Sequence, residues 1–363
     1  MKTALVGVGQ AGGKLTTALA SFDERMGFDA VRDAVVVNSA TADLRSVPFD
    51  TVLIGQDRVN GQGVGGDNEL GAELMERDID QVMGTLSGRI GSETEAVFVV
   101  AGLGGGTGSG GAPVVCRRLR RVYDIPVYAL GILPGDNEGA LYQHNAARSL
   151  KTLLTEADAT LVVDNDAWKA AGESLEAGYE AINKNIARRV GLLVAAGEST
   201  QGVGESVVDS SEIINTLQGG ELASLGYASS PAAEAAAENI TVITSTTRNA
   251  VLTGTSLPGA TTAEAALVVV AGEPDRLSRK GVEKARRWVE DETETLQVRG
   301  GDFPIESNRL ASLVLLGGVE RSDRIERLFA RAEQAAKERT EVDRATPSEP
   351  EKNFENDELD GLF

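Results

Sequence analysis

AGLGGGTGSGGAP, residues 101–113, contains seven glycines in thirteen positions and follows directly after the apolar run AVFVV at 96–100. Fixing a glycine costs more backbone entropy than fixing any other residue, so a cluster of this density needs a structural reason. The next segment, 114–123, has the pattern of an amphipathic helix, and a flexible linker does not fit between a buried strand and a helix. The pattern predicts a loop whose bare amides, with the hydroxyls of Thr107 and Ser109, cradle a polyphosphate, although the lysine of a P-loop is missing.

Similar apolar runs alternate with helical patterns over the first 165 residues. They are TALVGV (3–8), AVVVN (34–38), TVLIG (51–55), AVFVV (96–100), VYALGIL (127–133) and TLVVD (160–164). Strands that alternate with helices predict an α/β fold with a doubly wound, mostly parallel sheet. Such sheets bind ligands beyond the carboxyl ends of their strands, and the glycine clusters of this chain follow those ends.

The rest of the chain is predicted to form a long helix, a second domain and a tail. The helix ends before Gly197, a typical helix terminator. Apolar and charged runs then predict a mixed α+β domain with strands at 264–272 and 308–319, a charged helix near 275–296 and a final helix from 320. We therefore expect an N-terminal domain at 1–172, a central helix at 173–197, a second domain at 198–340 and a disordered tail at 341–363.

The composition limits the partners and the compartment. A net charge of −20, from 55 acidic and 35 basic residues, disfavours nucleic acid and anionic membranes as general partners, because their phosphates would be repelled. Only nine of the basic residues are lysines, which predicts either a salt-rich cytoplasm or an ordinary acidic protein. A single cysteine, Cys116, fits a reducing cytoplasm, and neither a signal peptide nor a membrane span is expected. The tail ends in NFENDELDGLF, which predicts either a solvated appendage or a peptide that docks on a partner.

Two further glycine clusters lie upstream of the first one. We refer to residues 7–12 as loop A, 61–71 as loop B and 104–110 as loop C. Loop A has the form G-x-G-x-x-G between a strand and a helix, so a dinucleotide site must be considered. That site requires an acidic residue at the end of the second strand, whereas this chain has Asn38 there and Asp43 only five residues later. Loop B, taken alone, is equally well a surface loop with an Asp-Asn turn.

Together these loops resemble the tubulin/FtsZ family. Loop C resembles the family's signature loop, Gly9-Gln-Ala-Gly12 the first phosphate loop of tubulin, and loop B another phosphate-side loop. The motifs occur in the family's order from residue 5 to about 230, and with the acidic, arginine-rich composition the chain is most similar to the haloarchaeal CetZ branch. The departures are Tyr142, where FtsZ has an arginine, Gly66-Asp67 in place of an Ala-rich form, and Val207-Val-Asp209 in place of Asn-x-Asp.

The resemblance implies a two-domain GTPase that binds GTP and GDP with Mg²⁺, assembles head to tail into filaments and controls cell shape. Gln10 is implied to help hold Mg²⁺, Pro134 and Glu138 to lie at the ribose, Asn165 and Asn183 to contact guanine, and Tyr179 to stack on it. The full implied GTP set is Gly9, Gln10, Ala11, Gly12, Gly13, Asn38, Gly65, Gly66, Gly104, Gly105, Gly106, Thr107, Gly108, Ser109, Gly110, Pro134, Glu138, Tyr142, Asn165, Tyr179 and Asn183.

Asp209 and Glu212 have both a structural and a functional interpretation. Asp-x-x-Glu before an apolar run is typical of a capping box, with Asp209 as the N-cap. The resemblance instead implies that both carboxylates enter the neighbouring subunit's nucleotide site and polarise the attacking water. Each carboxyl group has two oxygens, so both roles can coexist.

Three residues and two rival functions complete the predictions. Lys14 is either close to a phosphate or an exposed helix lysine, His144 is expected on a helix surface, and Cys116 is expected to be packed. One rival function is a GTP-binding scaffold that does not hydrolyse its ligand, and the other is a dinucleotide-dependent enzyme.

Overall fold

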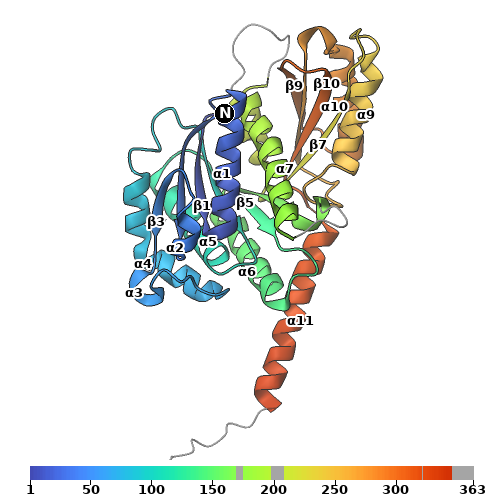
Figure 1. The fold of residues 1–363 in the computed structure, drawn as a ribbon. Helices are drawn as coiled ribbons and strands as arrows, with labels where there is room; N and C mark the ends of the chain where they lie inside the picture. Colours follow the sequence, from blue (N-terminus) through green and yellow to red (C-terminus); the bar gives the residue numbers. More distant parts are fainter. Residues whose placement is uncertain (169–174, 198–207, 321, 346–363) are drawn as a thin grey trace, which may run out of the picture.

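The computed structural model describes residues 1–168, 175–197, 208–320 and 322–345 (Figure 1). Ten strands form one sheet in the order β3-β2-β1-β4-β5-β6-β7-β10-β8-β9. The strands are β1 (Thr3–Val8), β2 (Val31–Asn38), β3 (Asp50–Leu53), β4 (Ala96–Gly102), β5 (Val127–Leu133), β6 (Ala159–Asp164), β7 (Leu222–Pro231), β8 (Ala265–Gly272), β9 (Val298–Pro304) and β10 (Arg309–Gly317). The helices are α1 (Gly9–Met26), α2 (Thr41–Leu44), α3 (Gln56–Val59), α4 (Asn68–Leu86), α5 (Thr107–Val122), α6 (Ala140–Glu156), η1 (Asn165–Trp168), α7 (Leu175–Ala196), α8 (Ser210–Leu217), α9 (Asn239–Leu252), η2 (Pro274–Arg276), α10 (Arg279–Thr293) and α11 (Asp323–Ala345).

The six predicted strands of the first half are confirmed, and all of them pair in parallel. β1 lies in the middle, with β2 on one side and β4 on the other. Each residue of β1, β5 and β6 is buried, because helices cover both faces of the sheet. In a parallel sheet the carboxyl ends of all strands lie on the same side, and loops A and C begin there.

The second half continues the same sheet. β7 joins β6 through only two residue pairs, Thr160 with Leu222 and Leu161 with Ala223. β10 then pairs antiparallel with both β7 and β8, while β9 is parallel to β8. The predicted mixed domain is therefore present, but its strands extend the sheet of the first half rather than forming a separate one.

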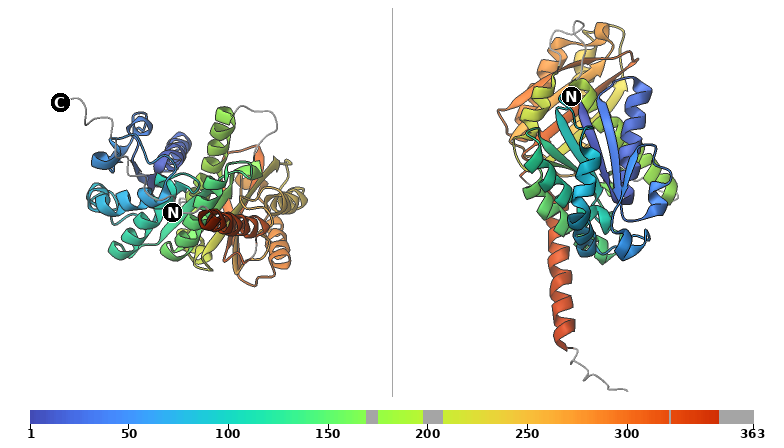
Figure 2. Two further views of the ribbon diagram at one scale, coloured as in Figure 1. Left: turned by 90° about the horizontal axis from the view of Figure 1, so that it is seen from below. Right: turned by 90° about the vertical axis from the view of Figure 1, so that its left-hand side faces the viewer.

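Helices divide between the two faces of the sheet (Figures 1 and 2). One buried cluster joins α1, α7 and α8 to the sheet, and the other contains α4, α5, α6, α9 and α10. Within the first cluster, Gly191 of α7 lies against the ring of Phe22 of α1, where a Cβ atom would collide with that ring. This glycine allows α1 and α7 to approach closely.

The central helix α7 runs between the carboxyl ends and the amino ends of the parallel strands. Its 22 residues correspond to about 33 Å. Near its carboxyl end, the Val194 carbonyl accepts a 2.6 Å hydrogen bond from the amino group of Met1, at the edge where β1 begins. Tyr179 and Asn183, near its amino end, lie beside the carboxyl ends of the strands.

The last helix, α11, projects away from the body of the protein (Figure 1). It ends at Ala345, so the tail that we expected from residue 341 overlaps the last turn of this helix. A regular helical pattern persists there because the sequence RTEVDRA contains neither glycine nor proline. Residues 346–363 lie outside the described part, so the predicted disorder and docking of the tail stay predictions. In the described ranges, no helix combines the length and the apolarity needed to cross a membrane.

Candidate functional site

A cavity of about 540 Å³ opens at the carboxyl ends of β1, β2, β4 and β5. Loops A, B and C and the segment after β5 form its walls. Its lining residues are Val8, Gly9, Gln10, Ala11, Lys14, Asn38, Ala40, Asp43, Gln62, Gly63, Val64, Gly65, Gly66, Gly102, Gly104, Gly105, Gly106, Thr107, Gly108, Ile132, Pro134, Glu138, Tyr142, Asn165, Tyr179 and Asn183. Most of the residues implied by the family resemblance are in this set.

Two long helices begin at the cavity without a capping side chain. The N-cap residues are Val8 for α1 and Gly106 for α5, and neither side chain accepts a hydrogen bond from its helix. Neither helix has an acidic residue in its first turn. By contrast, Asp67, Asp209 and Ser278 cap α4, α8 and α10. The open amides and the positive dipole ends of α1 and α5 therefore make the cavity suited to an anionic ligand.

Loops A and C touch each other through glycine backbone. Gly9 has φ +73°, and a Cβ atom there would lie 2.8 Å from the Gly108 nitrogen. Any other residue at position 9 would separate the two loops and strain the backbone. Next to this contact, the hydroxyls of Ser39 and Thr107 share a 2.7 Å hydrogen bond that ties the end of β2 to loop C.

Four of the residues implied to bind GTP do not line the cavity: Gly12, Gly13, Ser109 and Gly110. All four are buried between elements. A Cβ atom on Gly12 would collide with the Val100 carbonyl, and one on Gly110 would collide with the backbone of α4. Gly13 packs on the Val36 side chain, and the Ser109 hydroxyl turns back to the carbonyls of Gly105 and Gly106. Gly12 and Gly13 are small where α1 packs on the sheet, and Gly110 is small where α5 packs on α4. The role of these four residues in GTP binding stays a prediction.

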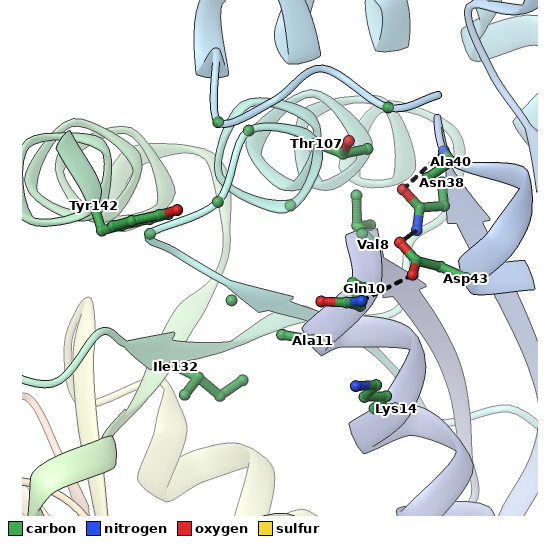
Figure 3. A pocket seen from close by; sticks show the side chains of 18 of the residues that line it. Val8, Gln10, Ala11, Lys14, Asn38, Ala40, Asp43, Thr107, Ile132 and Tyr142 are labelled. Atoms are coloured by element: carbon green, nitrogen blue, oxygen red, sulfur yellow. Dashed lines mark hydrogen bonds between the residues drawn. The ribbon is translucent and has the colours of Figure 1, made fainter. Parts of the chain in front are cut away.

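One wall of the cavity carries an ordered polar network (Figure 3). Asp43 accepts a 2.8 Å hydrogen bond from Gln10 Nε2 and a 3.0 Å hydrogen bond from Asn38 Nδ2. Asn38 Oδ1 accepts from the amides of Ser39 and Ala40. Because Gln10 donates to Asp43, its carbonyl oxygen is directed toward the cavity (Figure 3). Asp43 was not among the residues predicted to bind a ligand, because the dinucleotide pattern requires an acidic residue at the end of β2 itself. The signal for Asp43 is an acidic residue five positions after Asn38, the last residue of that strand.

The opposite side of the cavity is formed by the segment after β5 and by α7. The Tyr179 hydroxyl donates to Glu138 Oε1 at 3.2 Å, and the same carboxylate oxygen accepts from the Gly135 amide at 2.8 Å. Asn165 is buried and follows β6, whereas Tyr142 is 43% exposed. Two aromatic rings, two amides and a carboxylate therefore gather here, which suits a base and a sugar rather than phosphates.

The charges around the cavity are few. Among the described lining residues, Lys14 is the one cation, and Asp43 and Glu138 are the carboxylates. No group of three or more His, Cys, Asp or Glu side chains in the described ranges could hold a metal ion. A Mg²⁺ ion at this site would therefore take part of its coordination from a ligand's phosphates. The Gln10 carbonyl and the Asp43 carboxylate are oxygen donors of the type that Mg²⁺ prefers, so the residues present fit such an ion.

Asp209 and Glu212 lie far from the cavity, on the side of the sheet where the amino ends of the parallel strands lie. Asp209 caps α8, and its Oδ1 accepts from the Glu212 amide at 3.1 Å. The next residue, Ser210, donates to Glu95, which immediately precedes β4. A hydrogen bond from the Ser211 hydroxyl, followed by backbone amides, lowers the pKa of Asp209, whereas burial raises the pKa of Glu212. The predicted capping is thus present, and the exposed Asp209 carboxylate is available to a neighbouring molecule.

Two other predictions concern residues near the site. Cys116 is fully buried on α5, as expected. His144 is half-buried on α6 and is absent from the cavity wall.

Comparisons with known proteins agree with this geometry. Residues 2–173 match the GTPase domain of the tubulin/FtsZ family, and residues 172–334 match the C-terminal domain of tubulin-like CetZ. The chain is 66% identical to the tubulin-like protein CetZ2 of Haloferax volcanii, with 100% of both chains covered. A solved structure of that organism's CetZ2, a GTPγS-bound protofilament, superimposes with a TM-score of 0.91 and covers 94% of this chain and 100% of that chain. CetZ1 of the same organism, solved as a GDP-bound monomer, is 48% identical with a TM-score of 0.86, and 93% of this chain and 100% of that chain are covered. The chain therefore belongs to the tubulin/FtsZ family of GTPases, as a member of its CetZ branch.

Proposed function

We propose that the chain binds GTP and GDP in the cavity and hydrolyses GTP only between successive subunits of a head-to-tail filament. The observation that carries this proposal is that the cavity lies at the carboxyl ends of the strands and Asp209 at their amino ends. The six residues of β1 alone span about 20 Å between these two ends. Asp209 therefore cannot reach the nucleotide of its own chain, but it can reach the nucleotide of a subunit stacked along the strand direction.

The relatives support a stacked arrangement. The GTPγS-bound CetZ2 is described as a protofilament and the GDP-bound CetZ1 as a monomer. A contact between two different faces of the same chain does not close on itself and so generates a filament. Assembly then brings Asp209 and Glu212 of one subunit to the cavity of the next.

In this proposal, the cavity residues divide into a phosphate side and a nucleoside side. The amides at the starts of α1 and α5 bind the phosphates, because they are open donors at positive dipole ends. Asn165 and Asn183 satisfy the guanine edge, and Tyr179 stacks on the base. Gln10 and Asp43 would hold Mg²⁺ together with the phosphates, and the ion would offset negative charge on the phosphate oxygens.

Hydrolysis requires a water molecule in line with the bond between the γ-phosphorus and the oxygen that bridges it to the β-phosphate. The water forms a bond to the γ-phosphorus, the bridging bond breaks, and GDP and inorganic phosphate are the products. Asp209 is ionised at neutral pH, since its pKa lies below the ordinary range, and it orients the water by accepting a hydrogen bond from it. Open amides at the cavity stabilise the charge that develops on the phosphate oxygens.

The test measures GTP hydrolysis per molecule against protein concentration, in molar KCl with Mg²⁺. We expect the rate per molecule to rise from near zero as subunits assemble. The Asp209→Asn variant should bind GTP normally and hydrolyse it at least about 100-fold more slowly. Asparagine caps helices as well as aspartate does, so this variant removes the carboxylate without removing the cap.

Three outcomes oppose the proposal. A constant rate per molecule means that the site is complete in one chain, and normal hydrolysis by Asp209→Asn reduces this residue to a helix cap. Binding of GTP without hydrolysis at any concentration favours the non-hydrolysing scaffold.

We also propose that the filaments act in the cytoplasm in the control of cell shape, with no nucleic acid partner. The charge of −20 opposes association with polyanions, and the CetZ assignment supports a cytoskeletal role. Deletion of the gene should alter cell shape, and restoration of shape by the Asp209→Asn variant would show that hydrolysis is not required for it.

A further inference from the structure

Asn145 on α6 lies behind the cavity and contacts loops B and C at once. It is 1% exposed and is not among the lining residues. Its Nδ2 atom donates to the carbonyl of Gly66 at 2.8 Å and to that of Gly104 at 3.0 Å, with the Gly105 carbonyl further away at 3.4 Å. One buried amide is therefore the common partner of three glycine carbonyls in two loops.

The direction of these carbonyls determines the direction of the amides that follow them. In a planar trans peptide group, the C=O and the next N–H point in opposite directions. Carbonyls of Gly104 and Gly105 that point to Asn145 turn the amides of Gly105 and Gly106 away from it. Both residues line the cavity, and no acceptor in the described ranges takes a hydrogen bond from either amide. These two amides are thus left as donors for a ligand.

Packing alone does not fix this orientation. Loops B and C are in direct contact, since a Cβ atom on Gly106 would lie 2.9 Å from the Asp67 carbonyl oxygen. However, glycine has a wide choice of backbone angles, and van der Waals contact allows a peptide plane to rotate. A buried carbonyl without a donor costs about 1–3 kcal/mol, so the peptide plane of the buried Gly104 carbonyl would rotate toward water if Asn145 were lost. The Gly105 carbonyl also accepts from the Ser109 hydroxyl and would keep that donor.

We propose that Asn145 is a positioning residue that orients the phosphate-binding amide of Gly105 in loop C and holds loop B against that loop. It acts through the backbone and touches no ligand. This inference rests on the proposed binding of GTP in the cavity. It predicts that loss of Asn145 weakens binding of the phosphates and leaves the contacts of the nucleoside unchanged, because Asn165, Tyr179 and Asn183 lie on other elements.

The experiment compares the full chain with Asn145→Leu, which keeps most of the volume and removes the donor, and with Asn145→Ser, which keeps a shorter donor. Arg148→Ala is the matched control, because Arg148 lies one turn further along α6 and pairs with the exposed Glu69 of α4. Affinities for GTP, GDP and guanosine are measured by competition against a fluorescent GDP analogue, in molar KCl with Mg²⁺. Thermal unfolding without nucleotide reports on the fold of each variant.

For Asn145→Leu we expect GTP and GDP to bind about 10- to 100-fold more weakly, while the affinity for guanosine changes less than about twofold. Asn145→Ser should lie between this variant and the unaltered chain, and it carries the test if Asn145→Leu does not fold. Arg148→Ala should match the unaltered chain for all three ligands.

Two results would overturn the inference. Unchanged GTP affinity in both Asn145 variants means that packing alone holds the loops, and an equal loss for guanosine and GTP means that the residue supports the whole domain. If the unaltered chain binds none of the three ligands, the proposed function fails, which is a different result from either of these.

Discussion

Replacement of Arg324 by methionine should destabilise the protein in a pH-dependent manner. Arg324 of α11 is 1% exposed, pairs with Asp164 at 3.2 Å and with Asp136 at 3.3 Å, and donates to the Pro134 carbonyl at 2.7 Å. Asp164 is buried at the end of β6, and burial raises its pKa although Arg324 opposes that rise. Methionine keeps the apolar stem of arginine and removes its charge, so that Asp164 loses its closest cation.

The magnitude follows from the charge that is left behind. Removing one partner of a buried ion pair costs about 3–5 kcal/mol. The orphaned carboxyl can escape this cost by binding a proton, and from an ordinary pKa of 3.8 that step costs about 5 kcal/mol at pH 7.5 and about 2 kcal/mol at pH 5.5. We therefore expect a loss of about 3–5 kcal/mol at pH 7.5 and of about 2 kcal/mol at pH 5.5.

The sign of this pH dependence can be checked from the two states. In the variant, the folded pKa of Asp164 rises further above the unfolded value. As the pH falls through the folded pKa, only the folded chain gains a proton, so the folded state recovers stability until the unfolded chain is also protonated.

The assay is urea unfolding of the nucleotide-free protein at both pH values, in molar KCl. Arg331→Met is the matched control, since Arg331 lies on the same helix, is 48% exposed and pairs with Asp136. This control should lose no more than about 1 kcal/mol at either pH. The double variant Arg324→Met/Asp164→Asn should recover part of the stability at pH 7.5. Equal destabilisation by Arg324→Met at both pH values would refute the reasoning and assign the loss to packing.

Other predictions concern glycine, cysteine and carboxylate positions. Gly12→Ala should lower the unfolding midpoint, because its Cβ would collide with backbone. Gly105→Ala, whose Cβ meets nothing within 4 Å, should keep the midpoint and weaken GTP binding. The reverse pattern would contradict the view that Gly12 is required for packing and Gly105 for the ligand. Burial raises the pKa of Cys116, so its thiol should resist alkylation at pH 8 until urea unfolds the chain, and rapid reaction of the folded protein would count against this. Burial also raises the pKa of Glu212 from its ordinary value. If the ionised form of Glu212 takes part in hydrolysis, the rate should fall as the pH drops through this raised pKa, and Glu212→Gln should lack this limb of the profile.

The parts of the fold that the sequence predicted are those with a strong local signal. The six strands of the first half are continuous apolar runs, because parallel strands between two layers of helices are buried on both faces. β7 and α9 were not predicted. The α9 segment, NITVITSTTRNAVL, is rich in threonine and β-branched residues, which are poor helix formers. The hydroxyls of Thr244 and Thr247 donate to helix carbonyls one turn earlier, and tertiary packing, with the hydrogen bond from Thr246 to Ser230 of β7, holds the helix in place.

The candidate site was predictable where backbone forms it and not where buried side chains support it. Loops A, B and C have an unusual density of glycine, which is visible without a structure. Asn145 and Arg324 are single polar residues in ordinary helical patterns, and their partners are carbonyls and carboxylates up to 190 residues away. Neither residue belongs to a motif, and only the folded chain brings these groups together.

The division between backbone and side chains also explains how a strongly acidic chain can hold a polyphosphate. A net charge of −20 repels a polyphosphate at long range. Lys14 is the one cation that lines the cavity in the described ranges. A hydrogen bond from a fixed amide joins two groups in direct contact at about 3 Å, with no room for a salt ion between them, whereas in 1 M salt charges further apart than about 3 Å are screened. Amides at the starts of α1 and α5 therefore keep their effect in molar salt, where a cluster of surface lysines would lose much of its own. Such amides must be aimed by the fold, and this requirement accounts for both the glycines of the loops and the buried donor behind them.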